Sequence, residues 1–340
     1  MNLPDYNFLS APLWLVTTLH MVTLTLHFLA MNFMVGGIAV ILFGKLNNKW
    51  NDPTVQKFVK LFPTLMAATV TLGVAPLLFA QLVLAKPVYS ASIVSAWFWL
   101  MIFVVAMIAY YFLYGAAFRQ NGSNGRTATY LAIALIGFIY VSFIYSSVFS
   151  MAERPDLYQA LYASNQSGLV LNPEIGSYIW RWLHMLVGAV TVGGFFVGLV
   201  GRESEPIYKL GKSFFIWGMA VAMVIGVVYL FTLGEVLLPY MRSSGIWWLI
   251  IGIVLSLLSL HFYMKKNFLV SGLMLLVSVL GMVINRHVLR LLVLDGAHDP
   301  AAIPFAPQWS IFIIFLICFV IALALVWYML KLFFTSKQTA

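Results

Sequence analysis

The chain has 340 residues, of which 63% are hydrophobic and only 9% are charged, and its net charge is +9. Soluble domains of this size carry far more charge, so the composition excludes a soluble globular protein and indicates an integral membrane protein. Attraction of basic residues to anionic lipid headgroups accounts for the positive charge, and no nucleic-acid partner is expected.

Nine apolar runs are each long enough to cross a hydrocarbon core of about 30 Å. Each is expected to be a helix, because a lone strand would leave backbone polar groups unpaired in lipid. The runs cover residues 11–44, 57–85, 92–118, 127–150, 177–200, 212–234, 244–264, 267–292 and 309–334. We predict one all-α membrane domain made of two four-helix bundles and a C-terminal helix: helices 1–4 at about 11–150, helices 5–8 at about 177–292 and helix 9 at about 309–334. No convincing internal repeat is evident in the sequence.

Lysine and arginine predict the orientation of these spans. With the N-terminus outside, the inside loops and tail hold 13 of the 19 basic residues and the outside holds 6. This bias favours an outside N-terminus and an inside C-terminus. In a bacterium, the chain would be a multi-pass protein of the inner membrane with a periplasmic N-terminus. Its one cysteine, Cys318, can form no intramolecular disulfide, and without a Cys-x-x-Cys-His motif the chain attaches no c-type haem.

The first span carries two histidines within the stretch LHMVTLTLHFLAMNFMVGG. His20 and His27 are seven residues apart, which is two helical turns, so they face one side of the helix. Ionisable groups at depth cost about 2.5 kcal/mol or more unless they are partnered. His27 lies nearer the midplane than His20, which favours a ligand role for His27. For His20, a second ligand role and a hydrogen-bonding role stay open.

The fifth span opens with Arg181 and His184 in the stretch RWLHMLVGAVTVGGFFVG. The glycines that follow, from Gly188 to Gly198, allow either a flat ligand or a neighbouring helix to approach the backbone. His184 itself either binds a ligand or bonds a carbonyl in the headgroup zone.

Further polar residues lie at the ends of spans six to eight. Glu235 ends the sixth span, and Met241 and Arg242 open the seventh. The eighth span ends with Arg286, His287 and Arg290. With the orientation above, nearly all of these groups lie in the outer half of the membrane, which indicates a shared pocket there. The arginines could equally be outer-face anchors that snorkel to the headgroups.

Haem b fits a pocket of this composition. Its iron takes neutral histidine nitrogen, or histidine with a methionine thioether, and Met241 is the candidate thioether. Its two propionates are anions that suit arginine at the wet end of the pocket. Arg181 would then hold a propionate, and His184 would bind iron.

The chain resembles subunit I of cytochrome bd quinol oxidases in several stretches. LHFLAMNFMVGG is similar to the family's first helix, where His27 matches a haem ligand, and WRWLHMLVGAVTVGGFFVG is similar to the fifth, where His184 matches the low-spin haem b ligand. GVAPLLFAQ, residues 73–81, resembles the second functional stretch. HVLR, residues 287–290, can be laid on the eighth-helix Glu-Val-Gly-Arg, where the glutamate serves a haem, so the resemblance implies that His287 replaces it as a ligand. The resemblance implies nine spans, an outside N-terminus and two or three haems.

The chain departs from the family in three places. Gln81 stands where the family has a glutamate of the oxygen-reducing site, and an amide cannot relay a proton as a carboxylate does. If Arg242 occupies the family's arginine position, Ser244 occupies that of the ligand methionine, and only Met241 is close. The long quinol-binding loop between spans six and seven is reduced to GEVLLPYMRSSG. Glu235 is the candidate proton acceptor for a quinol bound at the outer ends of these spans.

These departures favour a quinol dehydrogenase over an oxygen reductase. The chain resembles shortened bd-like subunits that pair with periplasmic multihaem c-type cytochromes, and this resemblance implies that electrons pass from membrane quinol to such a partner. Three other functions stay open. One is an oxygen-reducing cytochrome bd-type subunit, and another is a haem-free transporter or membrane anchor. The third is an anchor for a soluble redox enzyme that passes electrons to quinone, because electron transfer is reversible and the sequence does not set its direction.

Overall fold

The computed structural model describes residues 8–44, 52–118 and 124–336, and these residues form an all-α protein. Nine of the described helices are long and apolar enough to cross a membrane, which confirms the nine predicted spans. They are α1 (Leu13–Phe43), α2 (Pro53–Val83), α4 (Ala96–Ala117), α5 (Asn124–Ala152), α7 (Ile175–Val200), α8 (Glu205–Phe231), α10 (Gly245–Met264), α11 (Phe268–Val293) and α12 (Trp309–Ser336).

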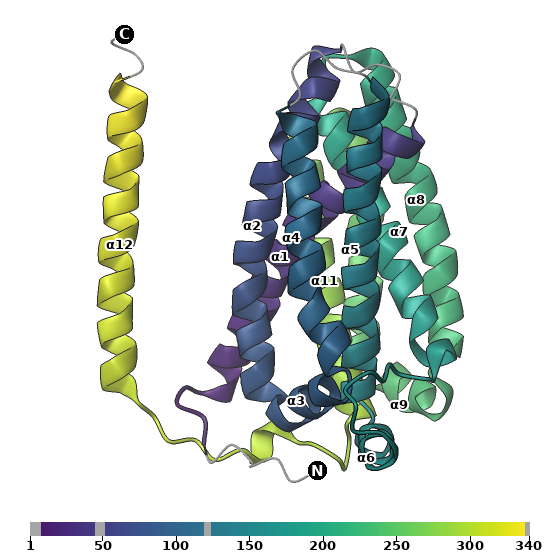
Figure 1. The fold of residues 1–340 in the computed structure, drawn as a ribbon, viewed down its shortest axis with the longest axis vertical. Coiled ribbons are helices and arrows are strands. Elements are labelled where there is room, and N and C mark those ends of the chain that lie inside the picture. The colour runs from purple at the N-terminus through teal and green to yellow at the C-terminus, as the bar shows by residue number, and fades with distance from the viewer. Residues whose placement is uncertain (1–7, 45–51, 119–123, 337–340) are drawn as a thin grey trace.

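Short helices fill the connections at the end of the bundle where the N-terminus lies (Figure 1). The predicted connections contain α3 (Ala85–Val94), α6 (Pro155–Ser164) and α9 (Leu237–Arg242), together with the 3₁₀ turns η2 (Gly234–Val236) and η3 (Pro300–Ala302). Too few apolar residues lie in these segments to cross a bilayer, so they lie at its edge.

Local sequence explains where several spans begin. Asp52 accepts a hydrogen bond from the Thr54 amide at 2.8 Å, and Pro53 occupies the first turn of α2, where no amide donor is needed. Lys266 adopts a left-handed backbone with φ of 57°, and Asn267 then accepts from the Val270 amide, which turns the chain sharply from α10 into α11.

Eight of the spans pack as four pairs of consecutive spans: α1 with α2, α4 with α5, α7 with α8 and α10 with α11. The first two pairs pack together through α2 with α4 and α1 with α5, whereas α7–α8 and α10–α11 touch each other only slightly, through α8 and α10. Instead, α1 packs against both α7 and α11, and α5 packs against α7. At the crossing of α1 and α7, a β-carbon added to Gly193 would lie 2.6 Å from the Gly36 Cα, so only glycine permits this approach.

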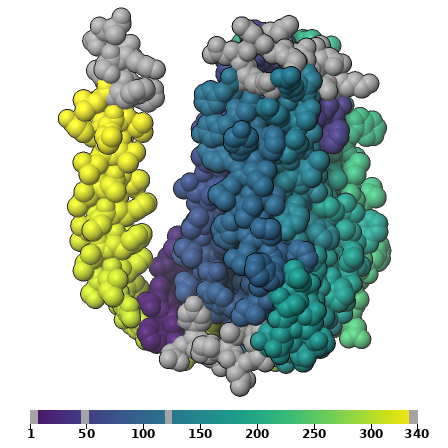
Figure 2. Space-filling model, viewed as in Figure 1, coloured from purple at the N-terminus to yellow at the C-terminus, as the bar shows by residue number. Residues whose placement is uncertain are grey.

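The ninth span, α12, stands apart from the other eight spans. Figures 1 and 2 show α12 running alongside the bundle and separated from it along most of its length, and none of its most apolar window is buried. Backbone hydrogen bonds hold its base, since Leu9 donates to Pro304 at 2.7 Å and the Ala306 amide donates to Leu9 at 3.0 Å. Lipid solvates such an apolar helix as well as protein does, so no packing partner is required for its stability.

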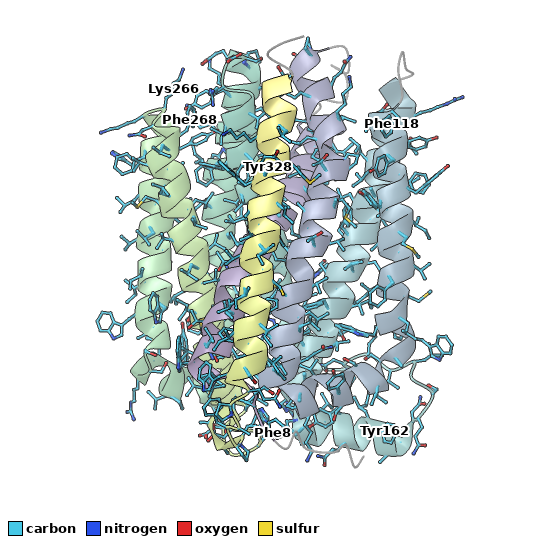
Figure 3. All side chains as sticks on the ribbon, turned by 90° about the vertical axis from the view of Figure 1, so that its left-hand side faces the viewer. Phe8, Phe118, Tyr162, Lys266, Phe268 and Tyr328 are labelled. Carbon is cyan, nitrogen blue, oxygen red and sulfur yellow. The ribbon has the colours of Figure 1, made fainter. Side chains whose placement is uncertain are left out.

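The two ends of the bundle differ in composition. An aromatic cluster that includes Phe195, Phe215 and Tyr263 fills the end opposite the N-terminus, beside Lys266. Figure 3 shows Lys266 and Phe268 at this end and Phe8 and Tyr162 at the other. The predicted site residues lie toward the end that carries the N-terminus.

Candidate functional site

A buried ion cluster joins three helices at the N-terminal end of the bundle. Glu153, the first residue after α5, accepts from Arg181 at 3.2 Å, from Arg290 at 3.0 Å and from Arg286. The side chains of Glu153, Arg181 and Arg290 are only 8%, 11% and 12% exposed. The structure therefore brings together three of the predicted arginines around a carboxylate that the sequence did not single out.

The ion cluster carries an excess of positive charge. Burial alone would raise the pKa of the Glu153 carboxyl, but Arg286, Arg181 and Arg290 together lower it to about 2. The carboxylate is thus ionised, and one negative charge faces three guanidiniums. Because uncompensated charge in a poorly hydrated site is costly, the cluster favours additional anionic groups.

Ser146 adds an unpaired polar atom beside the same cluster. Its carbonyl accepts from Arg181 at 3.2 Å, whereas its buried hydroxyl has no hydrogen-bond partner in the structure. A buried hydroxyl without a partner is uncommon, and an anion held by Arg181 would supply an acceptor.

Three of the predicted histidines are held by a backbone carbonyl of the following span. The Nδ1 atoms of His20, His27 and His184 each lie 2.9 Å from a carbonyl oxygen, of Pro76, Thr69 and Ala222 respectively. A carbonyl only accepts, so Nδ1 carries the hydrogen and a neutral ring keeps its free lone pair on Nε2. This is the arrangement by which proteins orient an imidazole that binds a metal through its other nitrogen.

His287 lies on α11 in the same region as the first span. His20, His287 and Arg290 are near enough to interact electrostatically, and α1 packs against α11. No group of three or more His, Cys, Asp or Glu among residues 8–44, 52–118 and 124–336 is arranged to hold a metal ion. Among the described residues, the predicted histidines therefore do not gather into one metal-binding cluster.

The glycines of α7 divide into two kinds. Gly193, Gly194 and Gly198 are in tight contact with neighbouring helices, so they serve helix packing. Gly188 lies one turn after His184, and nothing lies within 4 Å of the position that its β-carbon would take. The open space beside His184 is consistent with room for a ligand on that face.

The other predicted site residues lie away from this cluster. Glu235 lies in η2, and Met241 and Arg242 lie in α9, all of them exposed at the N-terminal end. In α9 the inward residue is Tyr240, which is fully buried and donates to Asn285 at 2.7 Å. Gln81 is partly buried on α2.

Neither Glu153 nor Tyr240 was predicted as a site residue. A carboxylate that directly follows a span, on the side where three arginines lie, was the signal for Glu153. Tyr240 gave no comparable signal, because a tyrosine at a membrane interface is common.

No family model matches this chain, and no curated protein and no solved structure matches it either.

Proposed function

We propose that this protein is a haem b-containing quinol dehydrogenase of the bacterial inner membrane, which passes electrons to a periplasmic multihaem c-type cytochrome. The observation that carries the proposal is the buried cluster of three arginines and one carboxylate, located in the same half of the bundle as carbonyl-anchored histidines. Its two uncompensated positive charges equal in number the two propionates of one haem.

The residues of the chain suit haem b in three respects. His184, His27, His20 and His287 offer imidazole nitrogen for axial bonds, and the first three are oriented by carbonyls. Arg181, Arg286 and Arg290, with the Ser146 hydroxyl, offer donors to propionate oxygens. The bound haem would supply reversible one-electron transfer. We expect two or three haems per chain.

The proposed direction of electron flow is supported by the side on which the site lies. The distribution of lysine and arginine favours an outside location for the N-terminal end, and the ion cluster is at that end. Oxidation of a quinol to a quinone releases two electrons and two protons, and Glu235, which is exposed at the outer ends of α8 and α9, is the candidate acceptor of a proton. Electrons would then leave to a partner on the same side.

The residue at position 81 supports a dehydrogenase over an oxygen reductase. Gln81 offers an amide where proton delivery to oxygen would need a titratable group. The connection between α8 and α10 holds only η2 and α9, so the quinol would bind helix ends rather than a long loop.

Anaerobic mixing of the purified protein with a short-chain quinol tests the proposal. We expect the spectrum of reduced haem b to appear, and little oxygen consumption when air is admitted without a cytochrome partner. Rapid oxygen reduction by the chain alone would indicate an oxidase instead. A preparation without any Soret band would indicate a haem-free transporter or anchor.

Substitution of one ligand sharpens this test. His184→Ala is expected to remove one low-spin haem b from the reduced-minus-oxidised spectrum, because His184 Nε2 would bind the iron of that haem. The matched control is His261→Ala, since His261 is exposed near the C-terminal end of α10, at the end of the bundle opposite the ion cluster. An unchanged spectrum in His184→Ala would refute the ligand assignment.

A further inference from the structure

Two spans share a pattern of residues that the sequence alone did not make conspicuous. In α1, His27 precedes the pair Gly36 and Gly37 by nine residues, and in α7, His184 precedes the pair Gly193 and Gly194 by the same nine residues. Nine residues of helix rise about 13 Å, so each histidine lies at a similar distance from its glycine pair.

The glycine pairs are also where the two spans meet. A β-carbon added to Gly36 would lie 3.0 Å from the Gly193 Cα, and one added to Gly193 would lie 2.6 Å from the Gly36 Cα. Since α1 and α7 cross the membrane in the same direction and touch at corresponding glycines, His27 and His184 lie at about the same depth.

Each histidine meets the next span in the same way. His27 Nδ1 bonds the carbonyl of Thr69, and Gly73 lies four residues later on α2. His184 Nδ1 bonds the carbonyl of Ala222, and Gly226 lies four residues later on α8.

In both cases the glycine leaves the space that the ring occupies. A β-carbon on Gly73 would lie 2.8 Å from Cε1 of His27, and one on Gly226 would lie 3.2 Å from Cε1 of His184.

The packing of the remaining spans extends this correspondence. We compare the first four spans, α1 to α5, with the next four, α7 to α11. In the first half α1 packs against α11, the last span of the second half, and correspondingly α7 packs against α5, the last span of the first half. Residues 27–32 of α1 and residues 181–188 of α7 are all partly exposed, and in each helix a buried stretch follows. The surroundings of His27 and of His184 therefore correspond in these local features, although the four spans of each half do not all pack alike.

We propose that His27 and His184 are the two copies of one ligand-positioning unit, and that Gly73 and Gly226 are its positioning residues. Each unit consists of an imidazole on one span and, on the next, a carbonyl that holds Nδ1 and a glycine one turn later that accommodates the ring. The carbonyl sets where Nε2 points, and the glycine leaves the room that this ring orientation needs, so both would determine whether Nε2 can bind haem iron. This inference rests on the proposed function for the identity of the ligand.

The two units differ in the distance between the imidazole ring and the position that a β-carbon on the glycine would take. At Gly73 the added methyl group would approach the ring below 3.0 Å, so the imidazole of His27 must move. At Gly226 the nearest approaches are 3.2 and 3.3 Å, which a shift of a few tenths of an ångström relieves. Alanine should therefore disturb the His27 unit more than the His184 unit.

Gly73→Ala and Gly226→Ala test the proposal by haem content and spectrum. In Gly73→Ala we expect at least a twofold loss of the haem that also disappears in His27→Ala. In Gly226→Ala we expect the haem of His184 to be retained, with a shifted reduced band or midpoint potential. Gly272→Ala is the matched control, because its β-carbon would meet only Phe195 at an ordinary 3.8 Å. Unchanged spectra in both variants would overturn the proposal.

A double substitution covers the case in which Gly73→Ala fails to fold. If the methyl group clashes with the imidazole, His27→Ala combined with Gly73→Ala should restore a monodisperse protein on size-exclusion chromatography. Failure of this rescue would place the clash elsewhere and contradict the proposal. Haem in the wild-type protein together with unchanged glycine variants would reject only this inference, whereas a wild-type protein without haem would reject the proposed function itself.

Discussion

The two halves of helix α7 use glycine for opposite purposes. Every residue from 181 to 188 is partly exposed, although these eight residues face all directions around the helix. Eight of the ten residues from 189 to 198 are buried. The first half carries Arg181, His184 and the open space at Gly188, whereas the second half packs against α1 and α8. A glycine-rich span can thus support a ligand site and a helix crossing at different depths.

A bulky residue at the helix crossing should have the largest effect. Gly193→Leu would drive a side chain into the Gly36 backbone, and this clash can be relieved only if α1 and α7 move apart. We expect a loss of stability of about 3 kcal/mol or more, seen as loss of monodisperse protein in detergent. Normal yield and an unchanged thermal midpoint would show that the crossing is not as close as described.

Neutralising the carboxylate of the ion cluster should come next. Glu153→Gln leaves three largely buried guanidiniums without an anion, and removal of one partner from a buried ion cluster costs about 3–5 kcal/mol. The thermal midpoint of the detergent-solubilised protein measures this loss. The loss should be larger in the haem-free protein than in the haem-bound protein if propionates help to neutralise the arginines, and an equal loss would argue against propionate binding at this cluster.

Acid should reproduce the effect of that substitution. The pKa of Glu153 is lowered from 4.5 to about 2 in the folded protein, so its stabilisation is complete above pH 4.5 and is lost as the pH falls from there toward 2. Thermal midpoints measured across this window should fall in the wild type and should fall less in Glu153→Gln. Parallel curves for the two proteins would contradict the assigned role.

Substitutions at the open glycine should have the smallest effect on stability. Gly188→Ala places a methyl group in open space, and alanine favours a helix by up to about 1 kcal/mol over glycine. We expect an equal or higher thermal midpoint. Gly188→Leu should fold as well but lose the haem of His184, because the larger side chain fills the space beside the ring. Haem retained in full by Gly188→Leu would show that the space is not used.

The nine spans were predictable, because lipid selects long apolar runs. The role of Glu153 was not predictable from the sequence, because a residue at the end of a span can face either water or the bundle. Only the fold brings Arg286 and Arg290 next to it. The matched units around His27 and His184 depend on a few residues per helix, too few for a repeat to be recognised. The separation of α12 was not predictable, because hydropathy does not distinguish lipid from protein contact.

Pyridine haemochrome quantification of the purified chain, with a reduced-minus-oxidised spectrum, tests the central claim most directly. The account predicts two or three haem b groups per chain, with at least one low-spin signal that depends on His184. A colourless protein, with Glu153 and its arginines bonding only one another, would contradict it.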